Sequence, residues 1–155
     1  MNKLATTFIN LIKSHPKTVF VLLLVGVSIF YDYHEILLKR PQSIHHWRQS
    51  DCASIALNYY QHGMNFFEPK THNLTSNNGT SGNTCTSEVP LLYYTVAGLY
   101  HIFGFHEFLY RLLNSLLFLT GLYYLFKLFN IVLKNQFWST LFALLFFTSP
   151  VLVYY

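Results

Sequence analysis

Charged side chains are scarce in this sequence. Asp, Glu, Lys and Arg together make up 10% of the 155 residues, against roughly 25% in an ordinary soluble domain. Hydrophobic residues reach 52% and aromatic residues 19%. A soluble domain of this size would expose large apolar patches, so the composition favours a chain embedded in a lipid bilayer. The formal net charge of +4 is scattered, and without a Lys/Arg cluster a nucleic-acid partner is not expected.

Cysteine is also rare, and the sequence has no internal repeat. Cys52 and Cys85 are the only two cysteines, and both lie in one polar region. They could form a disulfide if that region faces an oxidising compartment. They could equally be two unrelated thiols, because spacing alone does not determine connectivity.

A cleavable signal peptide is not indicated at the N-terminus. The apolar run over residues 18–31 follows Lys3, Lys13 and Lys17, but no small-x-small cleavage site comes after it. We therefore expect a retained membrane helix. The three lysines predict that residues 1–17 form a cytoplasmic N-terminal segment and that the large loop 39–88 is extracytoplasmic.

Four apolar segments predict an all-α, polytopic membrane protein. They cover residues 18–38, 89–105, 108–129 and 137–155, and each approaches the length that a hydrocarbon layer of about 30 Å requires. Short connections at 104–107 and 130–136 make the last three segments neighbours in an up-and-down arrangement. Region 89–155 is thus predicted to hold transmembrane helices 2–4, as a fragment of a longer transmembrane domain.

The loop over residues 39–88 divides into two parts. Apolar residues near helical spacing predict an amphipathic helix over 50–62, with Ser50 as its N-cap, lying parallel to the membrane surface. Residues 71–87 are rich in Ser, Thr, Asn and Gly, which is typical of an irregular loop.

The stretch IHHWRQSDCAS, residues 44–54, concentrates polar chemistry in this apolar chain. Asp51 has two interpretations: a carboxylate that compensates the dipole in the first turn of a helix, or a general base near the membrane–water boundary. His45 and His46 are adjacent and lack the spacing of a tetrahedral metal site, so we expect no metal centre built from them.

Glu88 precedes the second predicted span, with Pro90 in its first turn. It is either a carboxylate at a helix start or a second acid that approaches Asp51. Two carboxylates would suit a hard divalent cation, so a metal ion at Asp51 and Glu88 is possible.

The order of these motifs resembles the N-terminal part of bacterial membrane glycosyltransferases of the GT-C superfamily, the branch of the protein O-mannosyltransferases and lipid A aminoarabinose transferases (glycosyltransferase family 39 type). The segments that carry the resemblance are HHWRQSDCASIALNYYQHGMNFFEP, then SEVPLLYYTVAGLYHIFGFHEFLYRLLNSL, and FFTSPVLVYY. In that family an aspartate opens the membrane-parallel helix of the first extracytoplasmic loop, and an acid-x-Pro motif starts the second membrane helix. Asp51 and Glu88 occupy those places here.

The resemblance implies an enzyme of the plasma (inner) membrane that moves a sugar from a polyprenyl-phosphate donor to a lipid, glycan or protein acceptor. Asp51 would be the general base, Glu88 would position it or share a cation with it, and Arg48 and His46 would contact phosphate. Asp51 and Glu88 should then lie within about 10 Å of each other, where charges couple strongly at low dielectric. Such enzymes have many more membrane helices, so activity of the 155-residue fragment alone is doubtful. The alternative is a non-catalytic multi-pass scaffold or accessory subunit, and a transporter fragment ranks third because polar residues near the helix midpoints are sparse.

Overall fold

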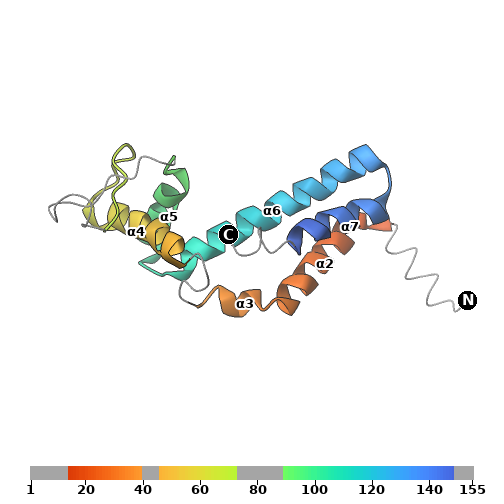
Figure 1. The fold of residues 1–155 in the computed structure, drawn as a ribbon, viewed down its shortest axis with the longest axis horizontal. Helices are drawn as coiled ribbons and strands as arrows, with labels where there is room; N and C mark the ends of the chain where they lie inside the picture. The colour runs from red at the N-terminus through yellow and green to blue at the C-terminus, as the bar shows by residue number, and fades with distance from the viewer. Residues whose placement is uncertain (1–13, 40–45, 73–88, 149–155) are drawn as a thin grey trace, which may run out of the picture. The chain divides into compact units, whose positions relative to one another are not determined.

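The computed structural model describes residues 14–39, 46–72 and 89–148. The described residues form helices and no strand, which confirms the all-α prediction (Figure 1). The chain divides into two compact units. Unit 1 comprises residues 1–36 and 115–155, and unit 2 comprises Leu37–Asn114.

Unit 1 is built from α2 (Pro16–Phe30), the larger part of α6 (Phe108–Leu133) and α7 (Gln136–Phe147). Phe20 of α2 stacks on Phe126 of α6 with ring centroids 4.2 Å apart. Phe147 of α7 packs against Phe118 of α6. The buried core contains two residues from each helix: Phe20, Leu24, Leu122, Phe126, Ala143 and Phe147.

The first apolar segment is broken, which corrects the predicted continuous helix over 18–38. α2 ends at Phe30, and the short helix α3 (Tyr33–Ile36) follows after a turn. Asp32 in this turn has a φ of 53°, a left-handed conformation that Asp tolerates better than most residues. With 15 residues, α2 is about 22 Å long at 1.5 Å per residue.

Among the described residues, α6 is the one helix long and apolar enough to cross a membrane. It begins at Phe108, as predicted, and continues four residues past the predicted end at residue 129. Its 26 residues extend about 39 Å, more than the hydrocarbon thickness of about 30 Å. Only 11% of its most apolar stretch is buried within the chain, so most of this surface is open to a surrounding medium.

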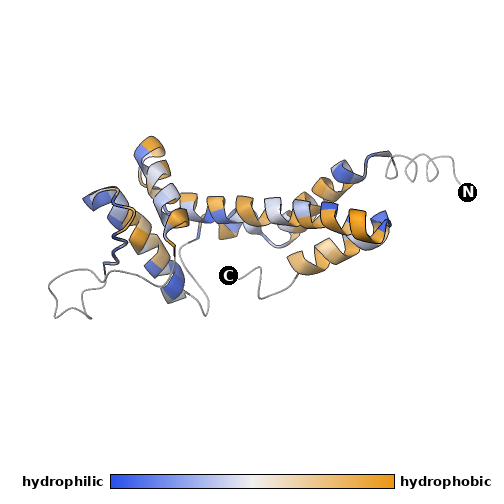
Figure 2. Cartoon of the chain, turned by 90° about the horizontal axis from the view of Figure 1, so that it is seen from above, coloured by the Kyte–Doolittle hydropathy of each residue, from blue (hydrophilic) through white to orange (hydrophobic). Residues whose placement is uncertain are grey.

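The other apolar helices are shorter. α2, α5 (Leu91–Phe103) and α7 have 15, 13 and 12 residues. In Figure 2, hydrophobic colour predominates along the helices of unit 1. Leu22 of α2 and Phe137 of α7 are among the apolar side chains exposed there. By length and composition alone, α6 could therefore cross a membrane, and these three helices are shorter than such a span. Part of the fourth predicted span, residues 149–155, lies outside the described residues.

A tight turn joins α6 to α7. Lys134 has a φ of 49°, and Asn135 is the N-cap of α7. The Asn135 side chain accepts hydrogen bonds from the backbone N–H groups of Phe137 and Trp138, at 3.0 and 3.3 Å. The connection is therefore shorter than the predicted 130–136, and α7 begins one residue before its predicted start.

Unit 2 is formed by α4 (His46–His62), α5 and the first turns of α6. α4 packs on α5, and the buried core is Ile55, Ala56, Tyr59, Tyr93, Val96, Ala97, Tyr100 and Leu109. The apolar face of α4, which we predicted to rest on lipid, is thus buried against protein. Pro90 is the N-cap of α5 and its carbonyl accepts a hydrogen bond from Tyr94 N at 2.9 Å. The helix therefore starts two residues after the predicted 89, and Pro90 precedes its first turn.

Candidate functional site

Asp51 lies inside α4 and not at its start. The helix begins at His46, so Asp51 is its sixth residue, and the first turn holds no acidic residue. This corrects the sequence prediction that Ser50 is the N-cap, because α4 starts four residues earlier and ends at His62 as predicted. Free N–H groups and the helix dipole act on the first turn. Capping therefore does not explain a carboxylate at this position.

A row of polar residues runs along one side of α4, and we call it the polar flank: Asp51, Ser54, Asn58, Gln61 and His62. Residues three and four apart on a helix share a face, so the row stands beside the buried residues Ile55 and Tyr59. Asp51 is half-buried. Its side chain makes no hydrogen bond or ion pair with any residue that the structure describes.

His72 closes onto the polar flank through a pair of contacts that we call the Ser54–His72 clasp. The backbone N–H of His72 donates to Ser54 Oγ at 2.8 Å, and Ser54 Oγ lies 2.7 Å from His72 Nδ1. His72 Nε2 lies 3.4 Å from Gln61 Oε1. An amide oxygen only accepts, so Nε2 carries a proton, and in the neutral ring Nδ1 accepts from the Ser54 hydroxyl. The clasp places residue 72 beside Ser54, which lies one helical turn from Asp51 on α4.

Sequence reasoning missed this clasp. The helical spacing of Ser54, Asn58 and Gln61 was a visible signal of a polar face. His72, however, is 18 residues beyond Ser54, in a segment predicted only as an irregular loop. The local pattern contained nothing that would pair them.

On its buried side, α4 is held to α5 and to the segment that follows α4. Tyr59 is 3% exposed, and its hydroxyl donates to the Phe66 carbonyl at 3.0 Å. Burial, and then the neighbouring Tyr94, raise the pKa of Tyr59 above its ordinary value. Cys52 is a free thiol, with its Sγ 3.3 Å from the Tyr93 hydroxyl. The structure therefore contains no disulfide at Cys52, and Cys85 lies outside the described residues.

The remaining predicted site residues are placed only in part. Arg48 lies one helical turn before Asp51, with its side chain exposed. His46 is the first residue of α4, and its side chain lies outside what the structure describes. Glu88 also lies outside the described residues, so its approach to Asp51 stays a prediction. Within the described ranges, no group of three or more His, Cys, Asp or Glu could hold a metal ion.

Chemically, the polar flank offers one carboxylate among neutral hydrogen-bonding groups. Asp51 can accept a proton, while Ser54, Asn58 and Gln61 carry both donors and acceptors. Such a combination suits a ligand rich in hydroxyl groups. Comparisons of the chain with protein-family models, with curated proteins and with solved structures find no match.

Proposed function

We propose that this chain is the N-terminal part of a GT-C-type membrane glycosyltransferase, which transfers a sugar from a polyprenyl-phosphate carrier to an acceptor hydroxyl. The observation that carries the proposal is the position of Asp51. Its carboxylate is half-buried inside α4, beyond the reach of the first-turn N–H groups. The motif order HHWRQSD, then SEVP, then the long apolar helix α6 supports the same assignment.

Asp51 acts as the general base in this proposal. A carboxylate is a far weaker base than an alkoxide. It therefore accepts the acceptor's proton late, as the sugar–phosphate bond breaks and the hydroxyl becomes more acidic. The acceptor oxygen bonds to the anomeric carbon with inversion, and the polyprenyl phosphate leaves with the bonding electron pair.

Three further residues bind the phosphate or position the general base. Arg48 lies one turn from Asp51 on α4, and a guanidinium binds phosphate oxygens through two parallel hydrogen bonds. His46 opens the same helix and contributes a further donor to the phosphate. Glu88 positions Asp51 or shares a divalent cation with it.

The proposed location is the plasma (inner) membrane, with α6 as one of four spans and the loop holding α4 on the outer side. α2, α5 and α7 are shorter than the hydrocarbon thickness of about 30 Å. Short hydrophobic segments are accommodated by local thinning of the bilayer and by flanking residues. The exposed apolar side chains of α2 and α7, such as Leu22 and Phe137, face lipid in this arrangement.

Asp51→Asn in the full-length protein tests the proposal. Membranes that contain the protein are supplied with radiolabelled polyprenyl-phosphate mannose or polyprenyl-phosphate aminoarabinose, and transfer of label is measured. A general base contributes about 10²- to 10⁴-fold in rate, so transfer should fall by that factor. Asp32→Asn is the matched control, because Asn tolerates the left-handed conformation at that turn as well as Asp does.

Two results would contradict the proposal. Wild-type rates from Asp51→Asn would exclude the general-base role. A wild-type protein that transfers neither sugar would favour the non-catalytic scaffold.

A further inference from the structure

Phe67 has the highest exposed fraction, 87%, among the large hydrophobic side chains of the described residues. Many of the other exposed apolar residues lie on apolar helices, such as Phe30 on α2 and Ile102 on α5. Phe67 instead belongs to the non-helical segment after α4. Scattered exposed apolar residues are common on proteins. Exposure alone therefore does not give Phe67 a role, and the contacts of the turn that carries it must be considered.

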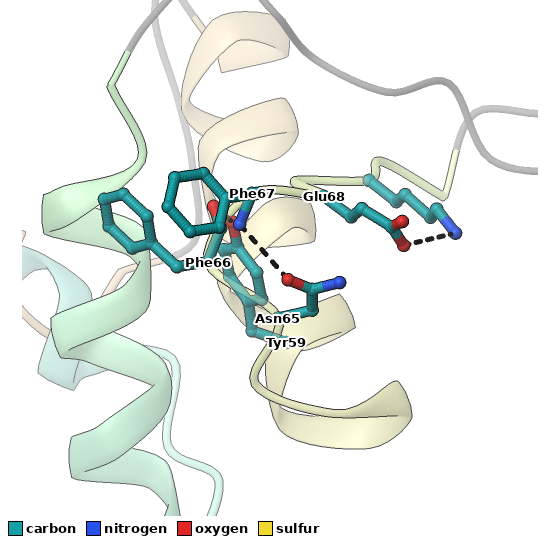
Figure 3. A network of polar contacts seen from close by, with 6 residues as sticks. Tyr59, Asn65, Phe66, Phe67 and Glu68 are labelled. Atoms are coloured by element: carbon teal, nitrogen blue, oxygen red, sulfur yellow. Dashed lines mark hydrogen bonds and ion pairs between the residues drawn. The ribbon is translucent and has the colours of Figure 1, made fainter.

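The turn that carries Phe67 is fixed to α4 and to α5, and Figure 3 shows it beside Tyr59 of α4. The Tyr59 hydroxyl donates to the Phe66 carbonyl at 3.0 Å, and the Tyr94 hydroxyl donates to the Met64 carbonyl at 3.2 Å. Within the turn, Glu68 N donates to the Asn65 carbonyl at 3.0 Å. These bonds hold the backbone on each side of Phe67.

The two aromatic rings of this turn have different surroundings. Phe66 packs edge-on against Tyr94, with ring centroids 5.4 Å apart. Phe67 packs edge-on against Phe66, at 5.5 Å, and is otherwise open (Figure 3). The Phe66 ring thus contacts both Phe67 and Tyr94. An exposed ring on a fastened turn loses little further conformational entropy when it binds, which favours binding.

The charges beside Phe67 neutralise each other. Lys70 Nζ lies 3.5 Å from Glu68 Oε2, so the turn presents no net charge of its own. Interfacial segments insert apolar side chains, Phe among them, into the boundary between lipid headgroups and acyl chains.

Unit 2 also includes the first turns of α6, residues 108–114, and α6 is the helix that can cross a membrane. The turn fixed to α4 and α5 therefore belongs to the same compact unit as the first turns of this helix. We propose that Phe67 is an interfacial anchor, which inserts into the headgroup–acyl boundary of the membrane that α6 crosses. This inference is independent of the glycosyltransferase proposal.

Depth-dependent fluorescence quenching tests the anchor. Phe67→Trp is made in full-length protein in which Trp47, Trp138 and any tryptophan outside these 155 residues are replaced by Phe. The protein is reconstituted into phosphatidylcholine–phosphatidylglycerol vesicles with bromine atoms at shallow or deep acyl positions. Interfacial groups lie about 5–10 Å into the boundary, so we expect blue-shifted emission that shallow bromines quench more strongly than deep ones.

His62→Trp in the same background is the matched control, because His62 is an exposed ring on the polar flank. Its emission should stay accessible to aqueous acrylamide and insensitive to bromine. If acrylamide quenches the Phe67→Trp variant as fully as it quenches the His62→Trp variant, the anchor is overturned. A second result would also overturn the anchor: emission of the Phe67→Trp variant that is shielded from acrylamide but insensitive to bromine at either depth. A protein surface and not lipid would then cover the ring.

Discussion

Tyr59 is the residue through which α4, α5 and the Phe67 turn are joined, and its replacement gives a quantitative test of unit 2. The ring is 3% exposed and meets Tyr94 edge-on at 5.5 Å, while the hydroxyl donates to the Phe66 carbonyl. Tyr59→Phe removes only the hydrogen bond, which contributes about 1 kcal/mol. Tyr59→Ala also removes the ring, and buried aromatic-to-Ala changes cost about 3–5 kcal/mol.

The thiol of Cys52 provides the assay. Cys52 is half-buried and packs against the core of unit 2, so its reaction with a soluble thiol reagent is expected to require local opening. In a Cys85→Ser background, the labelling rate reports the free energy of that opening. A cost of about 1.4 kcal/mol corresponds to a factor of ten. Tyr59→Phe should therefore raise the rate about fivefold, and Tyr59→Ala more than about a hundredfold.

The control is Tyr124→Phe, an exposed tyrosine of α6 in unit 1, which should leave Cys52 labelling unchanged. Equal rates for wild type, Tyr59→Phe and Tyr59→Ala would refute the argument that this side chain holds unit 2 together. A rise in the Tyr124→Phe variant would show that the assay responds to more than unit 2.

Two further predictions concern the same unit. Because burial raises the pKa of Tyr59, its stabilising contribution is complete below the ordinary value of about 10 and is lost as pH rises through the higher folded-state value. The tyrosinate absorbance of wild type minus Tyr59→Phe should therefore titrate above pH ~10, and titration at or below that value would contradict the burial. Ser54→Ala removes both contacts of the Ser54–His72 clasp, at about 1–3 kcal/mol. Trypsin cleavage after Lys70, measured by mass spectrometry, should then become about tenfold faster. Asn58→Ala, on the same flank, should leave the cleavage rate unchanged. Equal cleavage of both variants would show that the clasp does not hold the segment.

Helix positions were predictable where local chemistry alone decides them. The start of α6 at Phe108 was visible in the sequence, and α5 starts two residues after the predicted 89. Breaks within a helix and extensions of a helix end were harder to predict. Asp32 adopts a left-handed conformation that interrupts the first apolar segment, and no local pattern distinguishes such an Asp from one in a polar helix end.

The candidate site was predictable as a region but not in its detail. Ser50 is a good N-cap residue, yet α4 continues upstream to His46, because helix boundaries depend on packing as well as on capping. The apolar face of α4 was identified correctly, but sequence could not tell that α5 and not lipid would cover it. The clasp to His72 depends on the path of the chain after α4, which periodicity does not encode.

The turn between α6 and α7 has a consequence for the way in which this part of the chain enters a membrane. Within lipid, every backbone donor must be satisfied by the protein itself. The Asn135 side chain accepts from Phe137 N and Trp138 N, and the Asn135 carbonyl accepts from Ser139 N and Ser139 Oγ. The first turn of α7 thus needs few water molecules. Lys134 is the one charged residue between Leu128 and Phe147, and its long side chain can reach headgroups. In the proposed four-span arrangement, α6 and α7 therefore insert together as one hairpin, whose depth is set where the ammonium group of Lys134 meets water.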